Sequence, residues 1–331
     1  MQPSFLIRVP ENLPPSTLHT AQAGDPDAGP NGTIHYSIQG EDIDDFFTIN
    51  MTSGAVSTKR SLDREQRSNY TLIIEARDQG PFPRSSTAQL HVLVLDENDN
   101  TPTFTQKSYR TSVREGLPAG SEVTQLEAAD GDEGPSGEVT FSLVDDTFGA
   151  FTVNARSGTI RTARTLDREV RTQYTFWAVA TDGCARGPKS SIAKITVHVE
   201  DINDNSPMCA QSPVSAAVSA ETIVNHTVAT VRALDADMGE NGTVVFSLSE
   251  PDMVFEVGAE TGEVWLKSPL PSGFFGMRLL RVVVTDRGTP ALSSTCLVLV
   301  HLLGEEEGLQ FTEQVYEAAI PENSKAGTEP Q

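Results

Sequence analysis

The chain has 331 residues and a formal charge of −22, from 46 acidic and 24 basic side chains. This length predicts two or three domains, and the acidic excess argues against nucleic acid and anionic membrane surfaces as partners. Hydrophobic residues make up 37% of the sequence, which suffices for packed cores and excludes wholesale disorder.

Five short motifs return along the chain in the same order, about 100 residues apart. Each period opens on a glutamate of a segment such as "VPEN", and these anchors are Glu11, Glu115, Glu221 and Glu322. An acidic loop follows at 25–32, 130–137 and 235–242, then "LDRE" at 62–65 and 166–169, then a segment ending in aspartate at 75–78, 179–182 and 283–286. The first two periods close on "DENDN" (96–100) and "DINDN" (201–205), so the chain is a tandem repeat.

Between the motifs, apolar and polar residues alternate in short runs rich in Val, Ile, Thr, Tyr and Phe, with Gly, Pro, Asn and Asp between the runs. No long segment has helical periodicity. Such a pattern over about 100 residues is typical of a β-sandwich. The sequence therefore predicts three all-β units at 1–102, 103–207 and 208–309, followed by the start of a fourth at 310–331.

The recurring carboxylates and amides point to calcium, which takes six to eight oxygen ligands in flexible geometry. A single acidic run is usually just solvated, but solvation does not explain recurrence at one spacing. Zinc and copper prefer His and Cys, and none of the six histidines lies in these motifs. The loops lack the EF-hand spacing of ligands and glycine. Because "DENDN" ends one unit and leads into the next, we expect the ions at the junctions.

These motifs, in this order, resemble those of the extracellular cadherin repeat, and the resemblance covers essentially the whole chain. It implies tandem Greek-key sandwiches of an immunoglobulin-like kind in a linear rod, with roughly three calcium ions at each junction. Six ions at two junctions would change the formal charge from −22 to about −10. No tryptophan lies near residue 1, so the chain is more similar to long, non-swapping cadherins of the Dachsous, Fat and protocadherin types, as an internal or N-terminal fragment.

The resemblance assigns ligands residue by residue. At the first junction they are Glu11, Asp63, Glu65, Asp96, Asn98, Asp99, Asp130, Asp132 and Asp182, with main-chain carbonyls of Glu97 and Asn100. At the second they are Glu115, Asp167, Glu169, Asp201, Asn203, Asp204, Asp235, Asp237 and Asp286, with carbonyls of Ile202, Asn205 and Asn241. The third departs from the pattern: "KSPLPSG" (267–273) replaces "LDRE", and "LGEEE" (303–307) replaces the last motif. We expect little or no calcium there, and a bend or greater flexibility.

The implied function is calcium-dependent cell–cell adhesion through another cadherin in trans, either an identical or a related one. The alternative is a mechanical spacer that touches no partner, and the absence of an obvious exposed apolar stripe in the sequence is compatible with it. The resemblance places the parent molecule at the plasma membrane, with this chain on the extracellular side. We find no signal peptide or membrane-spanning run in the sequence, so we expect them elsewhere in the parent.

Several other residues have plausible roles. Sequons at Asn31, Asn50, Asn69, Asn225 and Asn241 fit a secreted glycoprotein, although Asn241 should face a junction. One pair among Cys184, Cys209 and Cys296 could form a disulfide, and Cys184 with Cys209 is one option. Trp177 and Trp265 lie in strand-like runs, where core packing is expected. The chain carries no nucleophile motif or phosphate loop and is not expected to be an enzyme or to bind a small-molecule substrate.

Overall fold

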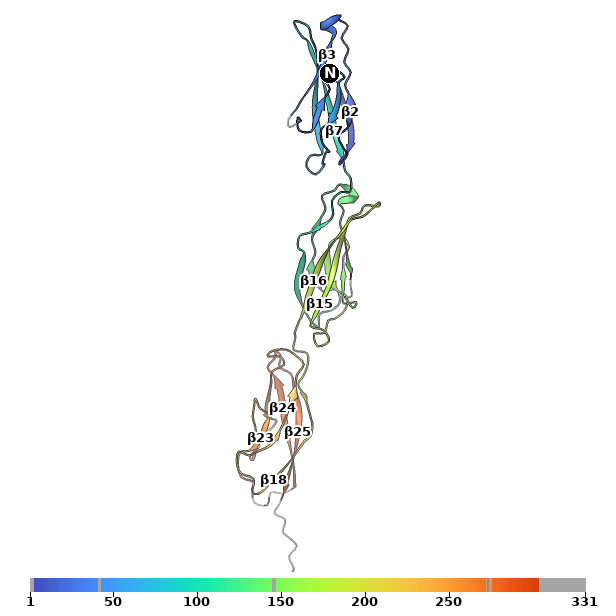
Figure 1. Ribbon diagram of the computed structural model, residues 1–331. Coiled ribbons are helices and arrows are strands. Elements are labelled where there is room, and N and C mark those ends of the chain that lie inside the picture. Colours follow the sequence, from blue (N-terminus) through green and yellow to red (C-terminus); the bar gives the residue numbers. More distant parts are fainter. Residues whose placement is uncertain (1–2, 41–42, 145–146, 272, 274–275, 304–331) are drawn as a thin grey trace, which may run out of the picture. The chain divides into compact units, whose positions relative to one another are not determined.

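The structure is a computed structural model that describes residues 3–40, 43–144, 147–271, 273 and 276–303. It is nearly all-β, which confirms the predicted fold class (Figure 1). Contacts divide the chain into two compact units, Met1–Glu200 and Asp201–Gln331, and each is described separately. The predicted fourth unit at 310–331, with Glu322, and Glu305 to Glu307 lie outside the described residues.

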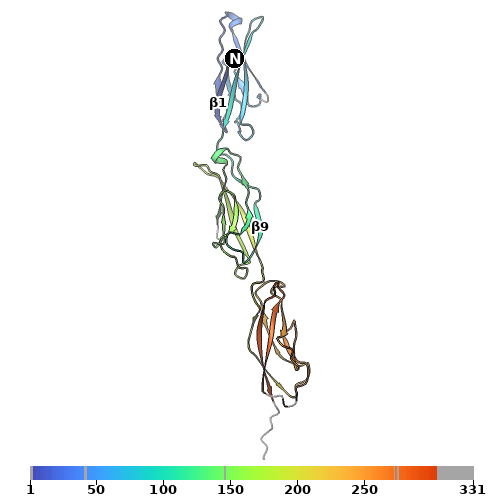
Figure 2. The same ribbon diagram turned by 180° about the vertical axis from the view of Figure 1, so that it is seen from behind.

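Repeat 1, made of β1 to β7, is a sandwich of a four-stranded sheet, β1-β7-β6-β3, and a three-stranded sheet, β2-β5-β4. The chain crosses between the sheets several times, although β4 and β5 are paired in one sheet and β6 and β7 in the other. Strand β1, labelled in Figure 2, pairs in parallel with β7. The elements are β1 (Ser4–Pro10), β2 (Thr17–Thr20), η1 (Gly29–Gly32), β3 (Ile34–Gln39), β4 (Phe47–Ile49), β5 (Ala55–Thr58), β6 (Asn69–Asp78) and β7 (Ser85–Leu95). Its core includes Phe47, Tyr70 and Leu90.

Repeat 2, made of β8 to β16, has the same plan, with sheets β12-β15-β16-β9 and β10-β14-β13 and a small pair β11-β8. Its own core includes Phe151, Tyr174 and Phe176. The elements are β8 (Thr103–Phe104), β9 (Ser108–Arg114), β10 (Glu122–Gln125), β11 (Ala128–Ala129), η2 (Gly134–Gly137), β12 (Thr140–Val144), β13 (Phe151–Val153), β14 (Thr159–Thr162), β15 (Gln173–Thr181) and β16 (Ser190–Glu200).

Repeat 3, made of β17 to β25, belongs to the second unit and has sheets β18-β25-β24-β21 and β19-β23-β22 with a pair β17-β20. Its core includes Phe255, Leu266 and Val298. The strands are β17 (Met208–Cys209), β18 (Val214–Ser219), β19 (Thr227–Thr230), β20 (Ala233–Leu234), β21 (Val244–Leu248), β22 (Phe255–Val257), β23 (Glu263–Leu266), β24 (Gly276–Asp286) and β25 (Ser293–Leu303). The boundaries predicted at 102, 207 and 309 remain predictions.

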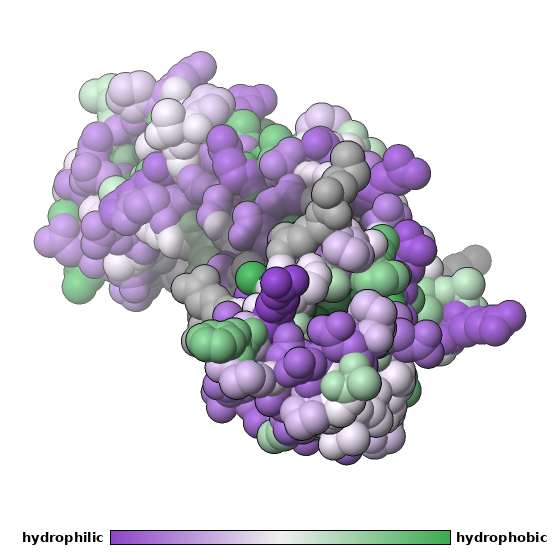
Figure 3. Space-filling model, turned by 90° about the horizontal axis from the view of Figure 1, so that it is seen from above, coloured by the Kyte–Doolittle hydropathy of each residue, from purple (hydrophilic) through white to green (hydrophobic). Residues whose placement is uncertain are grey.

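Strand alternation explains which residues reach the core. In β15, Tyr174, Phe176 and Ala178 are buried, so the residues between them face outward. Trp177 is one of these and is 36% exposed, so the predicted core packing of Trp177 is wrong. Trp265 is half-buried and lies outside the buried core of repeat 3. Hydrophilic side chains predominate on the surface seen in Figure 3, with hydrophobic ones in small groups between them.

The fold of repeat 3 determines which two cysteines form a disulfide. Cys209 of β17 and Cys296 of β25 form a disulfide, and Cys184 is free. The alternative pairing of Cys184 with Cys209 is therefore wrong. Within the described part of the chain, no helix has the length and apolar character needed to traverse a bilayer.

Repeat 3 also contains a half-buried ion pair between Asp252 and Arg278, and Asp252 accepts N–H groups of Val254 (2.7 Å) and Phe255 (2.9 Å). Burial raises the pKa of Asp252, but these donors outweigh it and hold the pKa below its ordinary value. The contribution to stability is therefore complete above the ordinary carboxyl pKa of about 3.9 and is lost as the pH falls through the folded-state value. We expect Asp252→Asn to lower the free energy of unfolding by about 1–3 kcal/mol at pH 7. Urea titrations from pH 7 to pH 2 should show the difference from wild type shrinking; a constant difference would contradict this assignment.

Candidate metal centre

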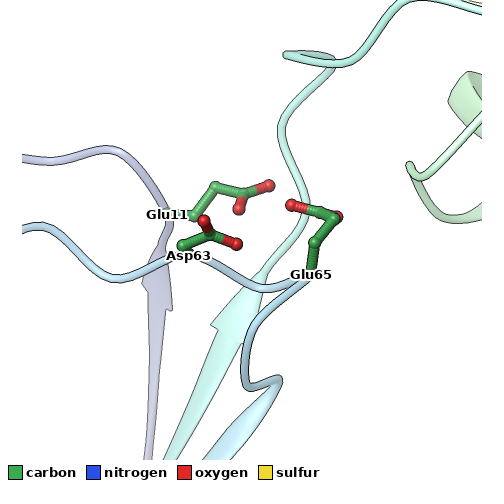
Figure 4. Close-up of side chains that lie close together, drawn as sticks. All are labelled: Glu11, Asp63 and Glu65. Carbon is green, nitrogen blue, oxygen red and sulfur yellow. The ribbon is translucent and has the colours of Figure 1, made fainter.

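Glu11 lies directly after β1 and is only 1% exposed. Its carboxylate accepts the N–H of Arg64 (2.8 Å) in the "LDRE" loop and the N–H of Glu97 (2.9 Å) in the "DENDN" segment. The carboxylates of Glu11, Asp63 and Glu65 face one another (Figure 4), and each offers an oxygen within 4.8 Å of the others. Three motifs far apart in sequence thus meet at one end of repeat 1.

A second trio joins repeat 1 to repeat 2 within the first unit. Glu65, Asp96 and Asp132 each offer a carboxylate oxygen within 4.8 Å of the others. The Glu133 N–H donates to Asp96 (2.8 Å), and the Asn100 side chain donates to Asp132 (2.7 Å). Carboxylates from both sides of the linker are therefore placed together.

The rest of the linker continues the cluster into repeat 2. The Asn98 amide donates to Asp182 (3.2 Å), which is 4% exposed and accepts N–H groups of Cys184 (2.9 Å) and Lys189 (2.8 Å). Burial raises the pKa of Asp182, but these donors outweigh it and keep the pKa below its ordinary value, so the carboxylate stays charged. The Asp130 carboxylate accepts the N–H of Asp132 (3.1 Å).

The remaining predicted ligands of this linker also accept hydrogen bonds. Asp63 accepts the N–H of Gln66 (2.9 Å), and Asp99 accepts an amide hydrogen of Asn12 (2.7 Å). The Glu97 carbonyl accepts the N–H of Asp99 (2.8 Å) in a tight turn. A carbonyl oxygen has a second lone pair, so this bond leaves the carbonyl able to contact a cation.

One cation of the chain lies inside the cluster, and the sequence prediction did not include it. The Arg64 guanidinium contacts Glu65 (2.6 Å) and Asp96 (2.7 Å). Burial raises the pKa of Glu65 and the Glu11 carboxylate raises it further, and these effects outweigh the lowering by a backbone hydrogen bond and by Arg64. The "R" of "LDRE", between two predicted ligands, was the available signal.

In each unit, the residues of the second linker make the same kinds of contact as those of the first linker. In the first unit, Glu115 is 2% exposed, accepts the N–H of Arg168 (2.6 Å) and forms a carboxylate trio with Asp167 and Glu169. In the second unit, the Asn203 amide donates to Asp286 (3.1 Å), and the Asn205 side chain donates to Asp237 (2.7 Å). These bonds match those of Asn98 and Asn100 in the first linker.

Asp201 makes the same contact as Asp96 in the first linker: it accepts the N–H of Met238 (3.0 Å), as Asp96 accepts the N–H of Glu133. The Asn241 amide donates to Asp201 (2.8 Å), as expected for a side chain that faces the linker. The Ile202 carbonyl accepts the N–H of Asp204 (3.0 Å), which repeats the Glu97–Asp99 turn.

Burial raises the pKa of Asp235, and the carboxylates of Asp237, Asp286 and Asp201 raise it further. The Asp235 carboxylate nevertheless accepts the N–H of Asp237 (3.0 Å), which fixes its position. Like charges held this close repel, and a cation among them would remove the repulsion.

Orphaned oxygens test whether these groups fit a cation. Buried polar atoms normally have a hydrogen-bond partner. Eight buried side-chain oxygens among the described residues have none: three are the hydroxyls of Tyr70, Ser191 and Ser294, and the other five belong to predicted ligands, namely Asn98 Oδ1, Asp130 Oδ2, Asp132 Oδ2, Asn203 Oδ1 and Asp235 Oδ2. An amide oxygen accompanied by carboxylate oxygens is a donor set that suits calcium. The residues therefore fit the ion that the sequence predicts.

The same end of repeat 3 is built differently. Glu221 is exposed, whereas Glu11 and Glu115 are buried. The Ser219 N–H next to it is satisfied by the Thr222 hydroxyl (3.1 Å). The described residues at this end thus lack the buried glutamate that organises the other two linkers.

This contrast supplies a matched pair of variants. Glu11→Gln removes charge from a carboxylate that holds two loops, so we expect it to abolish most of the calcium-dependent stabilisation of the first unit. Glu221→Gln should change the free energy of unfolding by less than about 0.5 kcal/mol, as for most exposed sites. Thermal unfolding with calcium and with chelator measures both effects. Equal responses of the two variants would contradict the assignment of Glu11.

Comparison with known proteins agrees with this architecture. The sequence profile described as "Cadherin domain" matches residues 5–95, 109–200 and 215–303. The chain is 44% identical to human Protocadherin-23 over 325 residues, covering 98% of this chain and 10% of that protein. It is 38% identical to Protein dachsous of Drosophila melanogaster over 331 residues, covering 97% of this chain and 9% of that protein. The chain therefore spans about a tenth of the length of these relatives.

Solved structures give the same result. The structure of mouse Cadherin-23 EC22-24 has a TM-score of 0.77 and 31% identity and covers 91% of this chain and 96% of that one. The Protocadherin GammaB4 extracellular domain has a TM-score of 0.78 and 29% identity, covering 92% of this chain and 50% of that one. The chain belongs to the cadherin family and consists of extracellular cadherin repeats, which confirms the resemblance read from its motifs. This family is not enzymatic, in agreement with the sequence prediction.

Proposed function

We propose that the chain is a calcium-binding part of a cell-surface cadherin ectodomain. The observation that carries the proposal is the set of buried, unpartnered acceptor oxygens in the two linkers. Calcium would supply the positive charge that the clustered carboxylates lack. In the first linker, Glu11, Asp63, Glu65, Asp96 and Asp132 would hold it, together with the Asn98 amide oxygen.

In the second linker, the proposed ligands of the first unit are Glu115, Asp167 and Glu169, and those of the second unit are Asp201, Asn203 and Asp237. Extracellular calcium modules bind at roughly 10⁻⁴–10⁻³ M, a range suited to the outside of the cell.

Adhesion to another cadherin in trans, identical or related, is the role that we propose for the assembled repeats. Family membership supports this role. Beads coated with the chain should aggregate in millimolar calcium, alone or mixed with beads carrying a Fat- or Dachsous-type cadherin, and disperse in chelator. If no combination aggregates although calcium binds, the spacer alternative replaces adhesion.

The proposed location is the extracellular side of the plasma membrane. Four sequon asparagines are exposed, Asn31, Asn50, Asn69 and Asn225; Asn31 lies in an acidic loop, and we propose glycosylation at the other three, as suits a secreted protein. Asn241 is half-buried and donates to Asp201, so we do not expect a glycan there. Intact-mass analysis of protein secreted from animal cells, with and without glycosidase, tests this assignment.

A further inference from the structure

The outer face of the four-stranded sheet of repeat 3 carries an exposed apolar stripe along β24 and β25, whereas no obvious stripe of this kind was expected from the sequence. In β24 and β25 alternate residues are buried, among them Leu280, Val282, Val298 and Val300, so the residues between them face outward. The outward set includes Met277, Leu279, Val283, Leu297, Leu299 and Leu303. Met277 is 67% exposed, Leu279 44% and Leu303 53%. We call this surface the repeat 3 outer face.

The same sheet in the other two repeats provides an internal comparison. Leu279 pairs with Leu299 in repeat 3, whereas Thr175 pairs with Thr196 in repeat 2 and Thr71 with His91 in repeat 1. The neighbouring apolar positions differ in the same way: Met277 and Leu297 correspond to Gln173 and Lys194 in repeat 2 and to Asn69 and Gln89 in repeat 1. Four polar or charged positions have thus become aliphatic or methionine in repeat 3 alone.

The outer faces of the four-stranded sheets also differ in charge between the three repeats. The outward positions of repeat 1 carry Arg8, Glu75 and Arg77, and those of repeat 2 carry Arg110, Arg114, Lys194 and Glu200. On the repeat 3 outer face the titratable side chains are Arg281 and His301, and none of the outward side chains of β18, β21, β24 and β25 is a carboxylate. A face without carboxylates is notable in a chain with 46 acidic residues.

This charge pattern indicates what covers the face. A strongly basic or acidic partner would need complementary charges, and one arginine and one histidine offer few. Two copies of a chain with a charge of −22 repel each other through their carboxylates, so a contact between them is least costly where carboxylates are missing. An apolar, nearly uncharged face is complementary to itself and suits an isologous contact about a two-fold axis.

We infer that the repeat 3 outer face is a self-association surface, which packs against the same face of a second copy of this chain. The inference deepens the adhesive role and rests on it for its biological meaning. Since β24 and β25 have 11 residues each, the face is about 35 Å long, and four strands make it roughly 15 Å wide. A footprint on the order of 500 Å² per copy is below the usual ~800 Å², so the dimer should be weak, with a dissociation constant of about 1 μM or more.

Analytical ultracentrifugation of the full chain over a wide range of concentrations tests the inference, in calcium and in chelator. Wild type should dimerise reversibly. Leu279→Thr with Leu299→Thr installs the repeat 2 pair and should weaken dimerisation at least about tenfold. The matched control, Val144→Thr with Ile192→Thr, removes exposed apolar side chains from the corresponding sheet of repeat 2 and should leave the dimer unchanged.

A second variant protects the test against misfolding. Met277→Asp changes a side chain that is 67% exposed, so it should fold normally, as circular dichroism and melting temperature can verify, and place like charges in the contact. A wild-type chain that stays monomeric, a Thr pair that dimerises as wild type does, or an equal loss in the repeat 2 control would each overturn the inference. Mass is measured independently of calcium-dependent stability and bead aggregation, so this inference and the proposed function can fail separately.

Discussion

Removing calcium should lower the melting temperature of this chain by more than about 10 °C. A site with a dissociation constant of about 10⁻⁴–10⁻³ M contributes about 1.4–2.7 kcal/mol at roughly 10 mM free calcium. Several such sites act on domains of about 100 residues, where 1 kcal/mol shifts the melting temperature by about 4–8 °C. The physical cause is the repulsion among carboxylates such as Glu11, Asp63 and Glu65, which a cation removes.

The variant Asp99→Ala with Asp204→Ala should lose most of this rise, because each substitution removes a carboxylate from one linker. The control Asp44→Ala with Glu256→Ala removes two exposed carboxylates outside the linkers and should keep the rise. Differential scanning calorimetry in calcium and in chelator compares all three proteins. The assignment is refuted if the double linker variant gains as much from calcium as wild type.

Loss of the disulfide should be the second large effect. Cys209 and Cys296 are 87 residues apart, and a bond that closes so long a loop stabilises by about 4–5 kcal/mol through the entropy of the unfolded chain. Cys296 is fully buried in the core of repeat 3, so its loss also disturbs packing. Cys209→Ala with Cys296→Ala should therefore unfold repeat 3 at much lower denaturant concentration than wild type.

Cys184→Ser is the matched control, because Cys184 is free and half-buried in repeat 2. It should change the free energy of unfolding by less than about 0.5 kcal/mol. Guanidinium titrations of the three proteins in calcium, with and without reductant, measure the effects. Wild-type protein that unfolds at the same concentration with and without reductant would contradict the role of the disulfide.

That these acidic residues gather at the linkers could be predicted, because they belong to motifs that recur in the same order along the chain. The hydrogen bonds that hold them could not, since they join segments far apart in sequence. Glu11 is an example: its motif marked it as a ligand, but nothing in "VPEN" shows that it accepts N–H groups of both Arg64 and Glu97. The part played by Arg64 also depends on three-dimensional contacts.

The errors come from strand orientation. The alternation of "YTFWAVATD" assigns Trp177 to the outer face once Tyr174 and Phe176 are inward, and the expectation of core packing gave more weight to its aromatic character. In β24 and β25 apolar residues fill both phases of the alternation, as in a strand buried on both sides. Only the register shows that Leu279 and Leu299 lie together on an exposed face.

The pairing of Cys209 with Cys296 was open for the same reason, because it depends on how the ends of repeat 3 fold back on each other. The fold class is set by local periodicity and was accessible from the sequence. Disulfide pairing and exposed faces are set by tertiary contacts and were not.

Direct counting of bound calcium tests the central claim. Equilibrium dialysis against millimolar calcium, followed by elemental analysis, should find about six ions per chain if each of the two linkers holds roughly three. The variant Asp99→Ala with Asp204→Ala should bind clearly fewer at the same concentration. A wild-type chain that binds less than about one ion, or a variant that binds as many as wild type, would contradict the account of both linkers.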